Sequence, residues 1–115
     1  MSGFGYRLDR AGAMRRVRAG IQRGMGLALE ALARASTDQA PKETGGLTDS
    51  CGVREEGLGG AVDYSVSYAA VQHENTALRH KNGGKGKYLS DPAADPAVHG
   101  MMLEALAAGC REEMR

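Results

Sequence analysis

The sequence predicts a small α+β domain with a long N-terminal helix, a β-hairpin, a short helix followed by a loop, and a C-terminal helix. Apolar residues recur at helical spacing in the first third of the chain, and apolar and polar residues alternate in the middle. Two Asp-Pro pairs, typical of helix starts, precede the last segment. With 115 residues and no internal repeat, the chain is expected to form one domain, residues 1–115.

The long helix is predicted from the spacing of its apolar residues. A Gly- and Ser-containing start, residues 1–6, is expected to be a loose arm. The residues that follow place one apolar face at steps of three and four: Met14, Val17, Ile21, Met25, Ala28 and Leu32. Gly20, Gly24 and Gly26 each weaken a helix by about 1 kcal/mol relative to Ala, and glycines so close together can mark the approach of another backbone. Ser36 to Asp38 and then Pro41 end the pattern.

Two strands are predicted after Pro41. The segment LTDSCGVREE puts Leu47, Cys51 and Val53 on one face, although Asp49 interrupts it. The segment AVDYSVSY alternates more regularly, with an apolar face of Val62, Tyr64, Val66 and Tyr68. Between them, residues 57–60 (GLGG) indicate a turn, so the two strands are expected to form a hairpin.

The remainder of the chain is expected to be a short helix, a loop and a last helix. Residues 69–74 favour a short helix, and residues 75–87 are typical of an exposed, mobile loop. Ser90 or Asp91 before Pro92, and Asp95 before Pro96, favour helix starts. The last helix is expected to bury its apolar face, which consists of Val98, Met102, Ala105 and Leu106.

The composition indicates a thin core. Only 4% of the residues are aromatic, whereas glycine occurs 17 times, so the chain is expected to gain stability by burying surface against copies of itself. The net charge of +1 excludes a strong overall attraction to nucleic acid. Charge is nevertheless uneven along the chain, and this asymmetry could steer a partner or set the polarity of a stack of subunits. The basic start contains Arg7, Arg10, Arg15, Arg16, Arg18 and Arg23, and the acidic end contains Glu104, Glu112 and Glu113.

The sequence contains no obvious catalytic or metal motif. Cys51 and Cys110 lack metal-ligand spacing and are expected to be reduced thiols. No signal peptide or membrane-spanning run is visible, so the protein is expected to be soluble and intracellular, with no membrane partner. Cys51 has no flanking base, and no G-x-S-x-G elbow is present. We therefore expect no enzyme activity and no cofactor.

Two features leave alternatives open. His73, Glu74 and His80 could bind a metal, but His73 and Glu74 are adjacent and are expected to point apart, so a histidine packed beside Tyr68 or Val71 is the simpler interpretation. The segment HKNGGKGKY could contact phosphate through its lysines and glycines, although it lacks P-loop spacing. It could equally dock on a neighbouring subunit or remain a solvated loop. The arginines of the first helix could likewise contact a partner or form an ordinary solvated face.

The order of the segments resembles the small tail-completion, or head–tail joining, proteins of long-tailed bacteriophages, which are often called neck or minor capsid proteins. The resemblance rests on the helix AMRRVRAGIQRGMGLALEALARAS followed by TGGLTDSCGV, on AVDYSVSYA running into YAAVQHEN, and on GKGKYLSDPA before the last helix. It covers residues 13–114. The Gly- and Lys-rich loop departs from the family pattern, which leaves open which surface it meets.

The resemblance implies a structural protein that forms a ring, commonly a hexamer, around the DNA channel between the neck and the tail tube. It would then be located in the virion, after assembly in the cytoplasm of the bacterial host, and would contact DNA at most without sequence preference. The residues to which the resemblance gives a role fall into three groups. The structural corner contains Tyr68, Ala69, His73 and Glu74; the docking loop contains Arg79, His80, Lys81, Lys85 and Lys87; the anchor of the last helix contains Tyr88, Leu89 and Pro92. Arg15, Arg16, Arg18 and Arg23 would face the channel or a partner.

Two other classes of function remain as alternatives. A small nucleic-acid-binding protein would use the arginine-rich helix and the lysine loop, and its binding would weaken steeply with salt. A metal-dependent hydrolase would be built on His73, Glu74 and His80, and would contain metal when purified.

Overall fold

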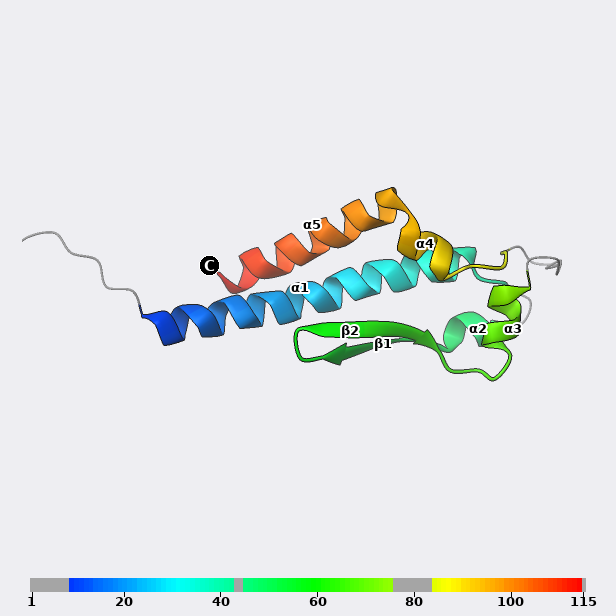
Figure 1. The fold of residues 1–115 in the computed structure, drawn as a ribbon, viewed down its shortest axis with the longest axis horizontal. Helices are drawn as coiled ribbons and strands as arrows, with labels where there is room; N and C mark the ends of the chain where they lie inside the picture. The colour runs from blue at the N-terminus through cyan, green and yellow to red at the C-terminus, as the bar shows by residue number, and fades with distance from the viewer. Residues whose placement is uncertain (1–8, 43–44, 76–83, 115) are drawn as a thin grey trace, which may run out of the picture.

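The computed structural model describes residues 9–42, 45–75 and 84–114. The chain folds as α1 (Arg10–Gln39), α2 (Gly46–Asp49), β1 (Cys51–Glu56), β2 (Gly59–Tyr64), α3 (Ala69–Glu74), α4 (Ser90–Ala94) and α5 (Pro96–Glu113) (Figure 1). This mixture of helices with one antiparallel hairpin confirms the predicted fold class. The expected N-terminal arm, residues 1–6, lies outside the described residues, as do residues 76–83 of the expected loop.

Helix α1 is the longest element of the molecule. Its 30 residues span about 45 Å. Asp9 caps its start by accepting a hydrogen bond from the Gly12 N–H at 3.1 Å. The helix stops at Ala40, which has the extended conformation (φ −70°, ψ 150°) that a residue before proline favours.

Helix α1 is the middle layer of three. Helix α5 runs antiparallel along one side of α1, and the β-hairpin lies along the other (Figure 1). A Cβ atom added to Gly24 would lie 2.9 Å from the Cα atom of Leu106, and one added to Gly20 would lie 3.1 Å from the Cα atom of Cys110. The interpretation that these glycines mark the approach of another backbone is therefore confirmed for Gly20 and Gly24. Gly26 faces the Glu55 side chain of the hairpin instead.

The predicted apolar face of α1 makes little of this contact. Apart from Ala28, no member of it is fully buried: Met14 is 63% exposed, Val17 is 41% exposed, and Ile21, Met25 and Leu32 are half-buried. The buried positions of α1 are mostly small residues, namely Gly20, Gly24, Ala28, Leu29 and Ser36. Small side chains allow close helix approach, so α5 packs on the glycine row, and Met14 and Val17 remain exposed.

The hairpin pairs Cys51 with Tyr64 at its base and Glu56 with Gly59 at its turn, where Gly57 has a left-handed φ of 59°. Both strands are shorter than predicted. Residues 47–50 form a helical turn rather than strand, because side-chain hydrogen bonds close the turn locally: Thr48 donates to the Gly45 carbonyl and Ser50 donates to the Leu47 carbonyl.

The second strand was predicted to continue to Tyr68 but ends at Tyr64. Beyond it the backbone turns into α3, and Ala69 donates to the Val66 carbonyl at 3.1 Å. The short helix itself lies where it was predicted, over residues 69–74. The start of α5 is also as predicted, because Asp95 caps it by accepting from the Ala97 N–H and Pro96 is its first residue.

The best-packed region lies where the C-terminal end of α1 meets α2, α3 and the segment before α4. Its buried members are Ala40, Leu47, Ala69 and Tyr88, with Tyr64, Val66 and Leu89 packed against them. Of the face predicted for the last helix, Val98 is buried, whereas Met102, Ala105 and Leu106 are half-buried. No helix in the described part of the chain is both long and apolar enough to span a bilayer.

Candidate functional site

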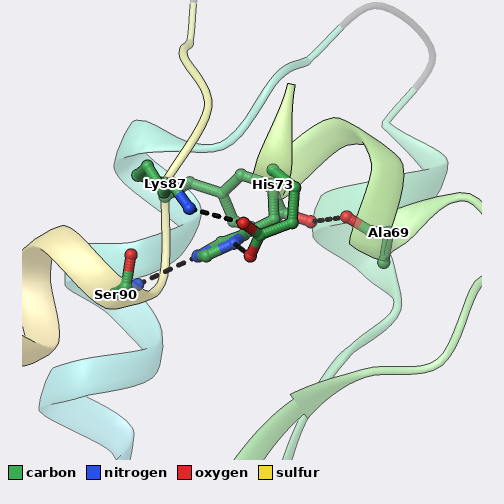
Figure 2. A network of polar contacts seen from close by, with 6 residues as sticks. Ala69, His73, Lys87 and Ser90 are labelled. Carbon is green, nitrogen blue, oxygen red and sulfur yellow. Dashed lines mark hydrogen bonds and ion pairs between the residues drawn. The ribbon is translucent and has the colours of Figure 1, made fainter. Parts of the chain in front are cut away.

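Three residues of the predicted structural corner, Ala69, His73 and Glu74, form hydrogen bonds with the segment that leads into α4 (Figure 2). Together with their partners Lys87, Tyr88 and Ser90 they are called the corner residues from here on. A backbone hydrogen bond joins α3 to this segment directly, because the Lys87 N–H donates to the His73 carbonyl at 2.6 Å. Lys87 has a left-handed φ of 56°, unusual for a residue with a side chain. This conformation lets both the backbone and the side chain of Lys87 reach α3.

The His73 ring has a hydrogen-bond partner on each nitrogen. Nε2 lies 3.1 Å from the backbone nitrogen of Ser90, and Nδ1 lies 2.8 Å from the Glu74 carboxylate (Figure 2). A backbone N–H can only donate, so Nε2 is the acceptor, and the neutral ring carries its proton on Nδ1 and donates to Glu74. Ser90 is the first residue of α4, where the helix itself offers the N–H no partner. His73 therefore holds the start of α4.

The expectation that His73 and Glu74 point apart is wrong. Both carboxylate oxygens of Glu74 are engaged, one with His73 Nδ1 and the other with Lys87 Nζ at 2.5 Å. Lys87 draws the carboxylate back across the end of α3, which brings it onto the ring of its neighbour. The hydrogen bond from Lys87, followed by that from His73, lowers the pKa of Glu74 below its usual value.

The contacts of His73 and Glu74 bear on the hypothesis that these residues bind a metal. The two ring nitrogens of His73 and the two oxygens of Glu74 are the atoms that would bind a metal, and each has a partner within the chain. The proposed third ligand, His80, lies outside the described residues. Among the residues that are described, no group of three His, Cys, Asp or Glu side chains is placed to bind an ion.

The lowered pKa of Glu74 predicts a pH dependence of stability. A carboxyl group with a lower pKa in the folded state stabilises the fold at pH values above its unfolded pKa, near 4.5, and this contribution disappears as the pH falls through the folded value. Unfolding by urea should therefore show wild type losing stability relative to Glu74→Gln as the pH falls from 6 to 3. A constant difference between the two proteins over this range would contradict the assignment.

Tyr88 forms the centre of the corner. It is 1% exposed, and its hydroxyl donates to the Ala69 carbonyl at 2.6 Å. Its ring packs edge-on against Tyr64 at 4.9 Å and His73 at 5.1 Å between centroids. Burial raises the pKa of Tyr88, which keeps the phenol neutral and able to donate.

The other residues singled out from the sequence lie around this network. Pro92 is fully buried at the start of α4, and Leu89 packs against the cluster that contains Tyr88. Tyr68 precedes α3 and is 42% exposed. Tyr64, which sequence reasoning placed only on a strand face, also joins the network, because its hydroxyl lies 2.6 Å from Ser36 Oγ of α1.

The described part of the predicted docking loop is structured. Gly86 is buried, the Lys85 N–H donates to the Gln39 carbonyl at 2.8 Å, and the Lys85 side chain pairs with Asp91. The described end of the predicted loop therefore contacts the end of α1 through Lys85, and Lys87 pairs with Glu74 of α3. Arg79, His80 and Lys81 lie outside the described residues.

The arginines of α1 do not form one basic surface. Arg23 lies 3.6 Å from Glu113 at the end of α5, because the antiparallel α5 returns along the start of α1. The charge difference between the two ends of the sequence is therefore partly cancelled in space and gives no simple polarity to the molecule. Arg15 and Arg16 line one hollow together with Asp9 and Glu113, whereas Arg15 and Arg18 line another.

Sequence reasoning missed a groove on this helix. Met14, Val17 and Ile21 of α1 and Leu58 of the hairpin turn line a hollow of about 290 Å³, together with Arg15 and Arg18. The periodic apolar pattern identified this helical face but could not show that it stays open. The available signal was the second row of small residues, Gly20 and Gly24, which offered α5 a closer approach.

Cys51 and Cys110 are both free thiols. Burial raises the pKa of the Cys51 thiol, which reduces the thiolate fraction that a reaction would need.

No protein-family model, no curated protein and no solved structure matches this chain.

Proposed function

We propose that this chain is a structural adaptor that assembles as a ring, in the role of a head–tail joining protein at the neck of a long-tailed bacteriophage. The ring, a hexamer in the family that the sequence resembles, would lie between the portal side of the neck and the tail tube. It would surround the DNA channel and meet DNA without sequence preference. Its partners would be copies of itself and the adjacent neck and tail proteins.

The observation that supports this proposal best is the amount of apolar surface left open. Large apolar side chains that are at least 38% exposed occur on both long helices, the hairpin and α3, and include Met14, Leu27, Val53, Leu58, Val71, Met101 and Leu103. Among the described residues, by contrast, the buried hydrophobic side chains are no larger than Leu apart from Tyr88. Singly exposed apolar side chains are ordinary in a monomer, but Met14, Val17 and Leu58 gather around one hollow, and such a contiguous apolar patch suits contact with a neighbour.

The corner fits the same role. Its hydrogen bonds join Lys85 to the end of α1, and Lys87 and Ser90 to α3, so the described C-terminal end of the proposed docking loop, residues 75–87, is anchored to the rest of the chain. An anchored end reduces the conformational entropy that a loop loses when it docks.

The test is the mass of the purified protein in solution, measured by light scattering over a range of concentrations at low and high salt. The proposal predicts a discrete particle containing an integral number of 12.1 kDa chains, six in the family's usual arrangement, that appears as a ring in negative-stain images. A chain that remains single at all concentrations, with or without neck proteins, and binds DNA with a steep salt dependence would instead establish the nucleic-acid alternative.

A further inference from the structure

Helix α4 has a histidine bound at each end. At its start, the Ser90 N–H donates to Nε2 of His73 at 3.1 Å, which joins α4 to α3 (Figure 2). At its other end, Nε2 of His99 in α5 lies 2.5 Å from the carbonyl oxygen of Ala93. Both backbone groups belong to the terminal turns of a helix, where the helix itself supplies no partner. The two histidines therefore supply hydrogen bonds that α4 cannot make alone.

The two contacts require opposite protonation of the same ring atom. The Ser90 N–H can only donate, so Nε2 of His73 carries no proton in this contact. The Ala93 carbonyl can only accept, so Nε2 of His99 does carry one. The proton of the neutral His73 ring then lies on Nδ1, which is 2.8 Å from the Glu74 carboxylate.

Proton uptake has a different effect on each contact. A charged imidazole carries a proton on both nitrogens. At His73, Nε2–H would then face the Ser90 N–H, and two donors cannot form a hydrogen bond. At His99, Nε2 donates to Ala93 before and after the ring is charged, and a positive charge near the last carbonyls of a helix is favourable. The contact at the start of α4 therefore requires a neutral histidine, and the contact at its end does not.

The neighbouring charges favour the loss of this one contact rather than the departure of the ring. The titratable and charged groups on the elements around His73 are Glu74 of α3, Asp63 and Tyr64 of β2, Lys87 and Tyr88 of the segment before α4, and Asp91 of α4. Asp91 pairs with Lys85. The hydrogen bonds of Glu74, first to Lys87 and then to His73, lower its pKa, so it remains a carboxylate when the ring gains a proton. A charged ring therefore stays on Glu74 and gives up Ser90.

We infer that α4 is a pH-sensitive hinge. Imidazole is the side chain that ordinarily changes its charge between pH 5 and 8. While His73 is neutral, the start of α4 is held on α3. When the ring takes up a proton, the first turn of α4 separates from α3, and its last turn stays on α5 through His99. The opening is local, because the bonds from Lys87 to the His73 carbonyl and from Tyr88 to the Ala69 carbonyl are unaffected. The hinge does not depend on the proposed ring of subunits.

The first test is the position of the ring protons in the wild-type protein. Long-range proton–nitrogen NMR spectra at pH 8 distinguish the two neutral forms of each histidine. His73 should carry its proton on Nδ1, and His99 should carry its proton on Nε2. A proton on Nε2 of His73 would overturn the hinge, because that atom could not accept from Ser90. A bare Nε2 on His99 would overturn it as well, since the second anchor would be absent.

The second test follows the Ser90 amide from pH 8 to pH 5. Its hydrogen-exchange protection, corrected for the intrinsic effect of pH on exchange, should fall by roughly two- to tenfold, the factor that one net hydrogen bond is worth. The fall should follow the same curve as the ring signals of His73. The Ala40 amide is the internal control, because it donates to the Ser36 carbonyl at 2.9 Å and neither group of that bond titrates.

Two glutamine variants assign the effect to one histidine. His73→Gln supplies an amide oxygen that can accept from the Ser90 N–H at every pH, so the protection of Ser90 should stay constant from pH 8 to pH 5. His99→Gln is the matched control. Its amide nitrogen can donate to the Ala93 carbonyl at every pH, and Ser90 should keep the wild-type pH dependence.

Three results would overturn the hinge in this experiment. They are constant protection of Ser90 while His73 titrates, a wild-type pH dependence in His73→Gln, and a His73 ring that takes up no proton between pH 8 and pH 5. If His73→Gln does not fold, the comparison of the Ser90 amide with the His73 ring in wild-type protein decides the matter without the variant.

Discussion

Gly24→Ala should destabilise the protein by about 1–3 kcal/mol, although alanine is the better helix former by about 1 kcal/mol. A Cβ atom at this position would lie 2.8 Å from Leu106 Cδ1 and 2.9 Å from the Leu106 Cα atom. The side-chain atom can move, but the backbone atom moves only if α5 as a whole shifts away from α1. The helices would then lose packing along their whole contact. Unfolding by urea, followed by circular dichroism, measures the change.

Gly100→Ala is the matched control for this prediction. Gly100 also lies within a helix, but a Cβ atom added there meets nothing within 4 Å. This substitution should therefore stabilise the protein by about 0.5–1 kcal/mol through helix propensity and the reduced entropy of the unfolded chain. If Gly24→Ala were as stabilising as Gly100→Ala, the close approach of α1 and α5 would be wrong.

Gly109→Ala extends the same argument across the interface. Its added Cβ atom would meet the backbone of Gly24 and lie 3.0 Å from the carbonyl carbon of Arg23. Both substitutions push the same two backbones apart, so the cost of the double variant should be less than the sum of the two single costs. Additive costs would indicate that the two glycines relax independently.

The sequence predicted the elements of this fold better than their contacts. The start of α5 depends on a short-range signal, the capping of the Ala97 N–H by Asp95, which can be read from neighbouring residues. The strand that was expected to begin near Leu47 is a helical turn there, because the hydrogen bonds of Thr48 and Ser50 outweigh an alternation of apolar residues that Asp49 already interrupts.

The candidate site was less predictable, since its partners are far apart in sequence. His73 was singled out from the sequence as a corner residue, but its hydrogen bond to Ser90 joins residues that are 17 positions apart. Glu74 and Lys87 are 13 positions apart, and nothing in the local pattern of either residue indicates the other. The groove was missed for a related reason. A periodic apolar face shows where a helix can be covered, whereas the fold determines whether this chain or another copy covers it.

Tyr88→Ala should cost about 3–5 kcal/mol, the usual range for the removal of a buried aromatic side chain. It removes the hydrogen bond to Ala69 and the ring contacts with Tyr64 and His73 at once. Domains of this size are commonly stable by only about 5–15 kcal/mol, so a large share of the stability would be lost. Chemical denaturation gives the total, and hydrogen exchange should show the amides of Lys87 and Ser90 losing protection.

Two further variants test which feature of Tyr88 causes this loss of stability. Tyr88→Phe keeps the ring and removes the hydroxyl, and it should cost about 0.5–1.5 kcal/mol, the usual net value of one hydrogen bond. Tyr68→Ala removes an equally large side chain that is 42% exposed, and the change should be much smaller than for Tyr88→Ala. Equal losses at the two tyrosines would mean that residues 84–90 are not fixed through Tyr88. Loss of Lys87 and Ser90 protection with little global destabilisation would mean that the corner opens independently of the rest of the fold.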